Sequence, residues 1–396
     1  MRNVITTLCA AGIAFATLGG QSKQPREIVG HVLKPTEAPA PEVGTLKVAD
    51  GFTVRRFADK LGKPRMLALA PGGGLYVTRR DVGDVLLVRD QNGDGIAEAP
   101  VVVARRPQMH GIAVAKDQVF LTTVKEVFTA PLQADGRLGE LKRIIDDLPD
   151  GGQHPNRTLA LGPDGMLYIS VGSTCNACDE TGPEHATLLR AKPTGESRTI
   201  FASGLRNTIG FGWHPTTGAL WGMDHGIDWL GDEDQGEELN EIQQGQQYGW
   251  PYIYADSKVN PQDEPPGKIP SEQWAKMSTP PVRLYTPHAA PMQMAFAQAN
   301  LPTAYRDGAF VAMHGSWNRQ PPSGYEVVFI RFDQGRPVSI EPFLSGFLTK
   351  TGANGWSISG RPVGLVVAPS GELFVSDDQN GVIYAITPTA AKGAAR

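Results

Sequence analysis

The chain has 396 residues, 40% of them hydrophobic, and a formal net charge of −4. This hydrophobic content supports a large core and excludes wholesale disorder, and the negative charge argues against binding nucleic acid or anionic membranes through bulk charge. Gly and Pro together make up 78 residues, which indicates a turn-rich fold without reaching the low-complexity range.

The first segment is typical of a secretory signal. A basic start, Met1-Arg2-Asn3, precedes an apolar run from Val4 to Gly20 that contains Ala14-Phe15-Ala16 as a candidate cleavage site. A membrane anchor is the alternative, although the run is short for a span. We therefore predict a signal peptide over residues 1–20 and a periplasmic or secreted protein with no membrane segment after its removal. A flexible Pro-rich arm is expected over 21–44 and a disordered tail over 389–396.

A degenerate repeat follows, in which an apolar strand, a turn and an aromatic-containing strand succeed one another. The first four copies recur about every 45 to 50 residues, the spacing of β-propeller blades. Each copy predicts two strands around a tight turn. The copies begin at Leu67, Gly111, Leu159, Gly210, Met294 and Leu365.

Six copies predict an all-β, six-bladed β-propeller over residues 45–388. Seven blades or a pair of β-sandwiches are the alternatives. Longer gaps around 232–292 and 314–360 predict Gly/Pro-rich insertions on the top face, where long loops on a rigid scaffold often carry function.

Several polar residues stand beside these strands. His154 precedes the third repeat, where an imidazole at a loop mouth could act as a general base. Arg206 and Asn207 precede the fourth repeat, and an arginine there could stabilise a developing oxyanion or bind a carboxylate. The alternatives are an ordinary loop histidine and a surface ion pair of Arg206 with Asp224 or Asp228.

Two cysteines remain once the signal is removed. Cys175 and Cys178 stand in Cys-Asn-Ala-Cys, and a zinc site there would need two further ligands, for which only His185 is near in sequence. In an exported chain a small disulfide ring is the favoured interpretation.

Taken together, the motifs resemble the soluble pyrroloquinoline quinone (PQQ) dependent sugar dehydrogenases, the glucose/sorbosone dehydrogenase family, and within it the sorbosone-dehydrogenase-like branch. The resemblance runs from about residue 45 to 388. It is carried by His154-Pro155-Asn156-Arg157-Thr158-Leu159, Gly204-Leu205-Arg206-Asn207, Glu238-Leu239-Asn240, Tyr248-Gly249-Trp250-Pro251, His314-Gly315-Ser316-Trp317-Asn318-Arg319 and Arg361-Pro362.

The resemblance implies a six-bladed propeller that holds PQQ and Ca²⁺ on its top face. His154 matches the base that takes the proton of the C1 hydroxyl of the sugar, and Arg206 matches the arginine that stabilises charge at the C5 oxygen of PQQ. The remaining residues match cofactor contacts and, through two backbone carbonyls, calcium ligands. The cofactor contacts are Asn207, Arg361, Arg319, His314 and Trp317, and the metal ligands are Gly226 and Ile227.

Two positions depart from the glucose-oxidising relatives. Ser173 stands where they carry an aspartate beside the histidine, and His110 falls near a glutamine of theirs. Both departures bear on what orients His154 and on which sugar is the substrate.

The leading functional hypothesis is therefore a PQQ- and calcium-dependent sugar dehydrogenase that oxidises an aldose or aldehyde sugar. It would pass electrons to a quinone or a small redox protein. The alternatives are a binding propeller without cofactor and a calcium-dependent lactonase, which would need carboxylate side chains at the channel centre.

Overall fold

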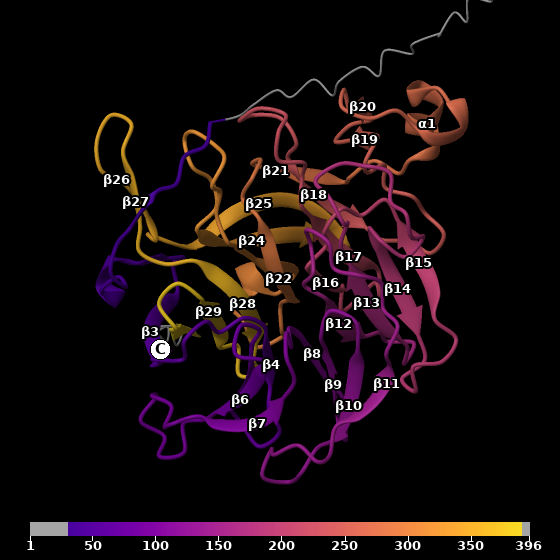
Figure 1. The fold of residues 1–396 in the computed structure, drawn as a ribbon. Coiled ribbons are helices and arrows are strands. Elements are labelled where there is room, and N and C mark those ends of the chain that lie inside the picture. Colours follow the sequence, from indigo (N-terminus) through magenta and orange to yellow (C-terminus); the bar gives the residue numbers. More distant parts are fainter. Residues whose placement is uncertain (1–30, 390–396) are drawn as a thin grey trace, which may run out of the picture.

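The computed structural model describes residues 31–389, and the predicted signal peptide and nearly all of the predicted C-terminal tail lie outside these residues. The described chain consists mainly of six antiparallel sheets of four or five strands (Figure 1). This arrangement confirms the predicted all-β propeller class.

The first strands of the six sheets contact one another in a closed cycle and surround the central axis. They are β4 (Leu67–Leu69), β8 (Gly111–Val114), β12 (Thr158–Leu161), β16 (Gly210–Trp213), β22 (Pro291–Phe296) and β28 (Pro362–Val367).

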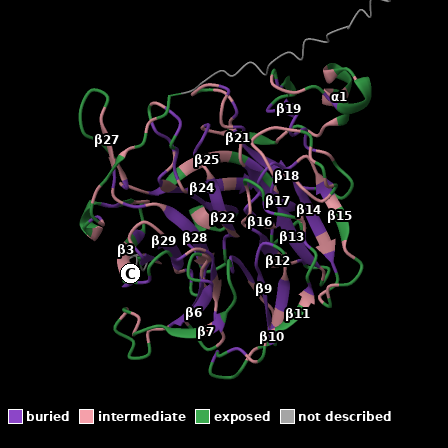
Figure 2. Cartoon of the chain, in the orientation of Figure 1, coloured by how far each residue is buried: buried purple, intermediate pink, exposed green. Residues whose placement is uncertain are grey.

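The second and third strands lie outside the first, and most of their side chains are buried (Figure 2). The second strands are β5 (Leu75–Arg79), β9 (Gln118–Thr122), β13 (Leu167–Val171), β17 (Leu220–Asp224), β23 (Gly308–Met313) and β29 (Leu373–Asp377). The third strands are β6 (Asp84–Val88), β10 (Val127–Pro131), β14 (Thr187–Ala191), β18 (Glu237–Glu241), β24 (Glu326–Asp333) and β30 (Val382–Pro388).

The fourth strands form the outer edges. They are β7 (Val101–Arg105), β11 (Lys142–Ile145), β15 (Thr199–Ser203), β21 (Arg283–Tyr285), β25 (Arg336–Ser345) and β3 (Phe52–Ala58). β3 comes from the beginning of the fold and pairs with β30 from its end, with Phe52 opposite Pro388. This pairing joins the two ends of the propeller in one sheet.

Each sequence repeat forms the first two strands of one sheet. In the third repeat, Asp164 and Gly165 make the turn between β12 and β13: Gly165 adopts a positive φ of 74°, and the Asp164 carboxylate accepts the backbone N–H of Met166. A residue with a side chain is strained at such a φ, which explains the Pro-Asp-Gly signature.

The long gaps between repeats contain regular strands as well as insertions. Residues 326–345 form β24 and β25, and 237–241 form β18, so the insertions are shorter than the sequence indicated. These strands lack the turn motif that marks the first two strands of a sheet. The true insertions hold β19 (Ile253–Tyr254), β20 (Lys258–Val259), β26 (Leu348–Lys350), β27 (Trp356–Ile358), α1 (Ser271–Met277) and a 3₁₀ turn at Pro266–Lys268.

The described part of the predicted arm lies against the propeller. β1 (Thr36–Glu37) pairs in parallel with β27, and the N–H of Leu33 donates to the carbonyl of Trp317. β2 (Lys47–Val48) adds a strand to β25, and short 3₁₀ turns occupy Val43–Thr45 and Thr303–Tyr305. Residues 31–44 are thus tied down by backbone pairing.

Candidate functional site

The polar residues gather at one end of the propeller axis. In an antiparallel sheet the start of the first strand lies beside the end of the second, as Gly210 lies opposite Met223 and Pro362 opposite Asp377. Side chains that precede the first strands therefore meet side chains that follow the second strands. The residues placed there are Arg65, His110, His154, Ser173, Arg206, Asn207, His225, His314, Arg361 and Asp378.

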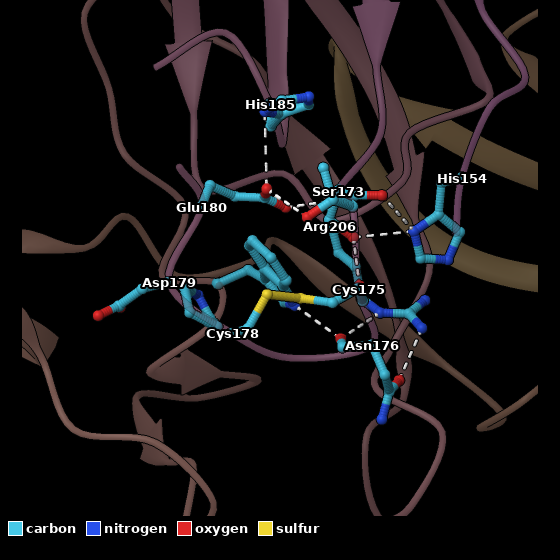
Figure 3. Close-up of a disulfide and its surroundings, with 12 residues drawn as sticks. His154, Ser173, Cys175, Asn176, Cys178, Asp179, Glu180, His185 and Arg206 are labelled. Atoms are coloured by element: carbon cyan, nitrogen blue, oxygen red, sulfur yellow. Dashed lines mark hydrogen bonds and ion pairs between the residues drawn. A yellow bond between two sulfur atoms is a disulfide. The ribbon is translucent and has the colours of Figure 1, made fainter. Parts of the chain in front are cut away.

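His154 is held through one ring nitrogen by the segment that follows β13 (Figure 3). Its Nδ1 lies 2.8 Å from Ser173 Oγ and 3.0 Å from Ser173 O. A carbonyl can only accept, so Nδ1 carries the hydrogen, and Nε2 presents its lone pair. Within residues 31–389, Nε2 has no hydrogen-bond partner. Burial, followed by the charge of Arg206 and the neighbouring His225, lowers the pKa of His154 to about 2. The imidazole is therefore neutral and suited to accept a proton at Nε2.

Arg206 and Asn207 are fixed by the carboxylate of Asp224 at the end of β17. The backbone N–H groups of Arg206 and Asn207 donate to Asp224 at 2.7 and 2.8 Å, and Thr208 Oγ1 donates at 2.8 Å. Burial raises the pKa of Asp224 to about 6 despite these hydrogen bonds. One buried carboxylate thus sets the backbone of the whole Arg-Asn-Thr segment.

The side chain of Asn207 points toward His154 and His225. Its Nδ2 lies 3.5 Å from His225 Nδ1, and a Cβ at Gly172 would contact both the Asn207 amide oxygen and the His154 side chain. The Asn207 Oδ1 atom is buried and has no hydrogen-bond partner in the described part of the chain. Such an unpaired oxygen is costly without a ligand, so it marks a point where a donor or a cation fits.

Gly226 and Ile227 follow His225 and are held by their N–H groups. Gly226 N donates to Glu237 at 2.9 Å, and Ile227 N donates to Gln235 at 3.2 Å. No N–H or side chain among the described residues donates to their carbonyl oxygens. Burial raises the pKa of Glu237 to about 8. The N–H groups of Ile227 and Asp228 share their peptide planes with these two carbonyls, and Asp228 N donates to Asn176 Oδ1 at 2.9 Å. Both carbonyls are therefore oriented, and their oxygens have no donor among the described residues.

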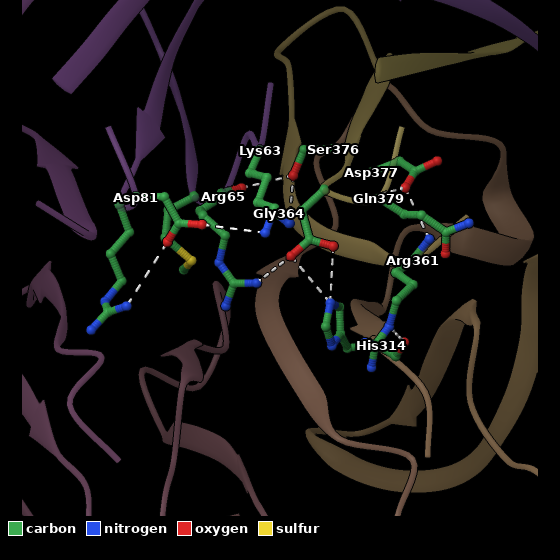
Figure 4. Close-up of polar contacts among 12 residues, drawn as sticks. Lys63, Arg65, Asp81, His314, Arg361, Gly364, Ser376, Asp377 and Gln379 are labelled. Atoms are coloured by element: carbon green, nitrogen blue, oxygen red, sulfur yellow. Dashed lines mark hydrogen bonds and ion pairs between the residues drawn. The ribbon is translucent and has the colours of Figure 1, made fainter. Parts of the chain in front are cut away.

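His314 forms a second cluster with Asp378 and Arg65, and Figure 4 shows the His314 and Arg65 side chains in it. His314 Nε2 lies 3.0 Å from the Asp378 carboxylate, which also binds Arg65 at 2.5 Å. Burial lowers the pKa of His314 to about 4. Although burial opposes ionisation of Asp378, His314 and Arg65 hold its pKa well below the usual range. His314 is thus a ring oriented by an ionised carboxylate.

Arg361 lies beside this cluster. Its Nε and Nη2 donate to the carbonyls of His314 and Gly315 at 3.1 and 3.0 Å, and its guanidinium stacks 5.7 Å from the ring centroid of Tyr325. Two of its nitrogens are thereby used for orientation, and Nη1 has no partner among residues 31–389. This geometry leaves the cation able to bind an anionic group.

Arg319 and Trp317 take different positions. The Arg319 guanidinium donates to the carbonyls of Asp232 and Pro321 and to the Glu233 carboxylate. The Arg319 guanidinium therefore binds the loop at 232–233 and Pro321, and among the described residues it shares no hydrogen-bond partner with Arg361. Trp317 is 39% exposed and packs edge-to-face on Trp229, with ring centroids 5.2 Å apart.

Cys175 and Cys178 are joined by a disulfide. Their sulfur atoms lie within 4.8 Å of a Glu180 carboxylate oxygen, but the bond between them removes the thiolates that a zinc ion requires. His185 lies on the far side of Glu180, with its Nδ1 3.6 Å from that carboxylate.

Sequence reasoning missed three residues of this site. Arg65 precedes its repeat as Arg206 and Arg361 precede theirs, so comparing equivalent positions between repeats would have found it. Asp378 follows its second strand as His225 does. Asn176, which holds the Arg206 guanidinium at 2.8 Å, lies in a loop with no repeat signal. Asp228 also holds this guanidinium, at 3.0 Å, and is one of the two ion-pair partners that the sequence suggested for Arg206, although the pair is buried and not on the surface.

The family model described as TrAA12-like matches residues 46–389. The chain belongs to the TrAA12-like family. Together with relatives that are named as PQQ-dependent sugar dehydrogenases, this match confirms the predicted resemblance to that family of enzymes.

Relatives of this TrAA12-like protein include a PQQ-dependent sugar dehydrogenase of Hypocrea jecorina. The two are 26% identical, with 87% of this chain and 90% of the relative covered. An uncharacterised protein of Borreliella burgdorferi is also 26% identical, over 86% of this chain and 90% of its own. Among solved structures, a calcium structure of the Trichoderma reesei family AA12 enzyme has a TM-score of 0.75 at 22% identity. It covers 90% of this chain and 99% of its own.

Proposed function

We propose that this protein oxidises an aldose or aldehyde sugar, with PQQ as the hydride acceptor and Ca²⁺ as the ion that polarises it. The observation that carries this proposal is the neutral His154 ring, held at Nδ1 and open at Nε2. The names of the sugar dehydrogenase relatives support the same chemistry.

The residues at this end of the propeller fit both groups. Ca²⁺ takes oxygen ligands, and the carbonyls of Gly226 and Ile227 and the buried Oδ1 of Asn207 are oxygens without donors in the described chain. PQQ carries several carboxylates, and Arg361 offers a cation with an unpaired Nη1. When bound, these groups supply the redox chemistry and a Lewis acid.

The chain's own residues then bind, orient and move a proton. His154 Nε2 takes the proton of the C1 hydroxyl of the sugar as hydride leaves C1, so that a cyclic aldose becomes a lactone. Arg206 would stabilise negative charge on the hydride acceptor, and its burial would strengthen that interaction. The electron pair then passes to a quinone or a small redox protein.

The disulfide supports export. A bonded Cys175–Cys178 pair is typical of an oxidising compartment, which agrees with a periplasmic or secreted protein. Within residues 31–389, no helix is long and apolar enough to cross a membrane.

The test is a PQQ titration of the purified mature protein in the presence of Ca²⁺, followed by dye reduction with a panel of aldoses and sorbosone. We expect saturable binding and sugar-dependent reduction. Binding without turnover on any sugar would contradict the substrate class. Absence of PQQ binding, or hydrolysis of lactones without PQQ, would overturn the proposal in favour of a binding propeller or a lactonase.

A further inference from the structure

The disulfide closes a ring of four residues, Cys175 to Cys178, that lies beside the Arg206 side chain (Figure 3). Cys175 and Ala177 pack against an apolar cluster of Ala186, Ile227 and Trp250. The ring is therefore seated on the protein and closed on itself, which leaves its backbone little freedom.

Asn176 uses both of its oxygens to hold one edge of the Arg206 guanidinium. Its backbone carbonyl accepts Arg206 Nε at 2.9 Å, and its side-chain Oδ1 accepts Arg206 Nη2 at 2.8 Å. The same carbonyl accepts Trp250 Nε1, and the same Oδ1 accepts the N–H of Asp228 at 2.9 Å. These two cross-contacts prevent Asn176 from turning away.

The guanidinium is thus fixed on one side and open on the other. Asp228 adds a third acceptor to the guanidinium, 3.0 Å from Nη2, whereas Nη1 has no partner among residues 31–389. The Arg206 side chain is only 3% exposed. A long side chain with several rotatable bonds needs such anchoring if its charge is to stand ready where negative charge develops.

The ring is also connected to His154. Ser173 Oγ donates to the carbonyl of Cys175 at 2.7 Å, and the same Oγ contacts His154 Nδ1. Residues 173–178 therefore touch both groups to which the proposed function assigns a chemical role.

We propose that Asn176, fixed within the Cys175–Cys178 ring, is the positioning residue that orients Arg206 for sugar oxidation. This inference rests on the proposed function for its kinetic consequence. The disulfide accordingly contributes to turnover through the arginine, in addition to any contribution to stability.

The first test compares Asn176→Ala with Asn176→Asp. The alanine variant keeps the backbone carbonyl but loses Oδ1, so kcat is expected to fall about 10- to 100-fold, the range for a lost hydrogen bond to a charged group. KM and the PQQ dissociation constant are expected to stay within about twofold of the wild-type values, because the substitution releases only the Arg206 side chain. The aspartate variant restores both acceptors and is expected to recover most of kcat. Asn300→Ala, which removes an exposed loop amide, is the matched control.

A second measurement does not depend on turnover. In the protein without PQQ, the Nε–H resonance of Arg206, assigned with Arg206→Lys, is expected to be sharp and slow to exchange. It should be lost or broadened in Asn176→Ala and in the double variant Cys175→Ser/Cys178→Ser, and be restored in Asn176→Asp. The double variant keeps Asn176 and can replace Asn176→Ala in this measurement if Asn176→Ala does not fold.

The outcomes separate the two proposals. An unchanged kcat in Asn176→Ala, an unchanged Arg206 resonance in both variants, or a loss of kcat that Asn176→Asp does not recover would each overturn the positioning role. A wild-type protein that binds no PQQ or oxidises no sugar would refute the proposed function. The Arg206 Nε–H resonance would then be the measurement that tests whether Asn176 holds Arg206.

Discussion

Ser173 orients the His154 imidazole through a hydroxyl group whose hydrogen is already donated to the Cys175 carbonyl. Its Oγ donates to the carbonyl of Cys175 at 2.7 Å and lies 2.8 Å from His154 Nδ1. A hydroxyl has one hydrogen, so toward the histidine the oxygen accepts. The serine thereby selects the same tautomer that an aspartate at this position would select, without adding a negative charge.

Replacing His154 tests its role as the general base. His154→Gln is expected to lower sugar-dependent dye reduction by about 10²- to 10⁴-fold, the range for loss of a general base. PQQ binding should persist, because Arg361 and Asn207 remain. Stopped-flow reduction and an absorbance titration measure the two effects separately. Turnover equal to that of the wild type would refute the assignment.

Exchanging Ser173 for aspartate should change the pH dependence. A carboxylate beside Nδ1 favours the protonated ring, so it would raise the pKa of His154 from its low value of about 2. Protonation removes the acceptor at Nε2, and the acid limb of the kcat/KM profile is therefore expected to move to higher pH in Ser173→Asp. In profiles from pH 4 to 9 the wild type and the uncharged comparison Ser173→Ala should stay level on the acid side, whereas Ser173→Asp should lose activity as the pH falls. Coincident acid limbs for all three proteins would show that Ser173 does not govern the ring.

Arg361 is expected to contribute to cofactor affinity. Arg361→Ala removes a charge-assisted contact with a carboxylate and should weaken PQQ binding about 10- to 100-fold. A fluorescence titration with PQQ in excess Ca²⁺ measures the dissociation constant. Arg336→Ala, which removes an exposed guanidinium on β25, provides the control. Equal affinities of Arg361→Ala and the wild type would exclude the contact.

Glu238 should make the protein less stable as the pH rises. Burial raises its pKa to about 8 in the folded protein, against 4.5 for an ordinary glutamate. Between these values the unfolded chain has released a proton that the folded protein retains, so the free energy of unfolding falls as pH increases, by at most about 1.4 kcal/mol per pH unit. This contribution is complete below pH 4.5 and is lost by pH 8.

Glu238→Gln keeps an oxygen for the N–H of Ala255 but has no proton to lose. Urea unfolding at pH 5 and pH 8 is expected to show a smaller decline in stability for this variant than for the wild type. Exposed Glu196→Gln should decline like the wild type. Parallel declines in all three proteins would show that Glu238 is ionised at both pH values.

The repeats predicted the parts of the fold that depend on local sequence. Each Pro-Asp-Gly turn or its variants joins two strands that are adjacent in the chain, and the site residues flanking those strands were therefore within reach of sequence reasoning. His154, Arg206 and Arg361 were found in this way, and the structure places all three at one end of the propeller.

The remaining contacts depend on loops that meet only after folding. Asn176 reaches Arg206 across 30 positions, and the carboxylate of Asp378 reaches Arg65 across 313. Neither pairing has a periodic signature. Arg319 shows the converse case. Its motif is local and one acceptor, the Pro321 carbonyl, is two residues away, but the Asp232 carbonyl and the Glu233 carboxylate that also accept from its guanidinium lie 87 and 86 positions away.

The pairing of β3 with β30 has a consequence for biogenesis. Phe52–Ala58 is among the first parts of the propeller to be synthesised, yet its hydrogen-bonding partner is the last. Closing so long a loop is entropically slow, and until it closes β3 remains an unpaired strand edge. A nascent chain therefore exposes that edge for nearly the whole of its synthesis, and we expect a holding chaperone that covers β3 to have the greatest effect on yield.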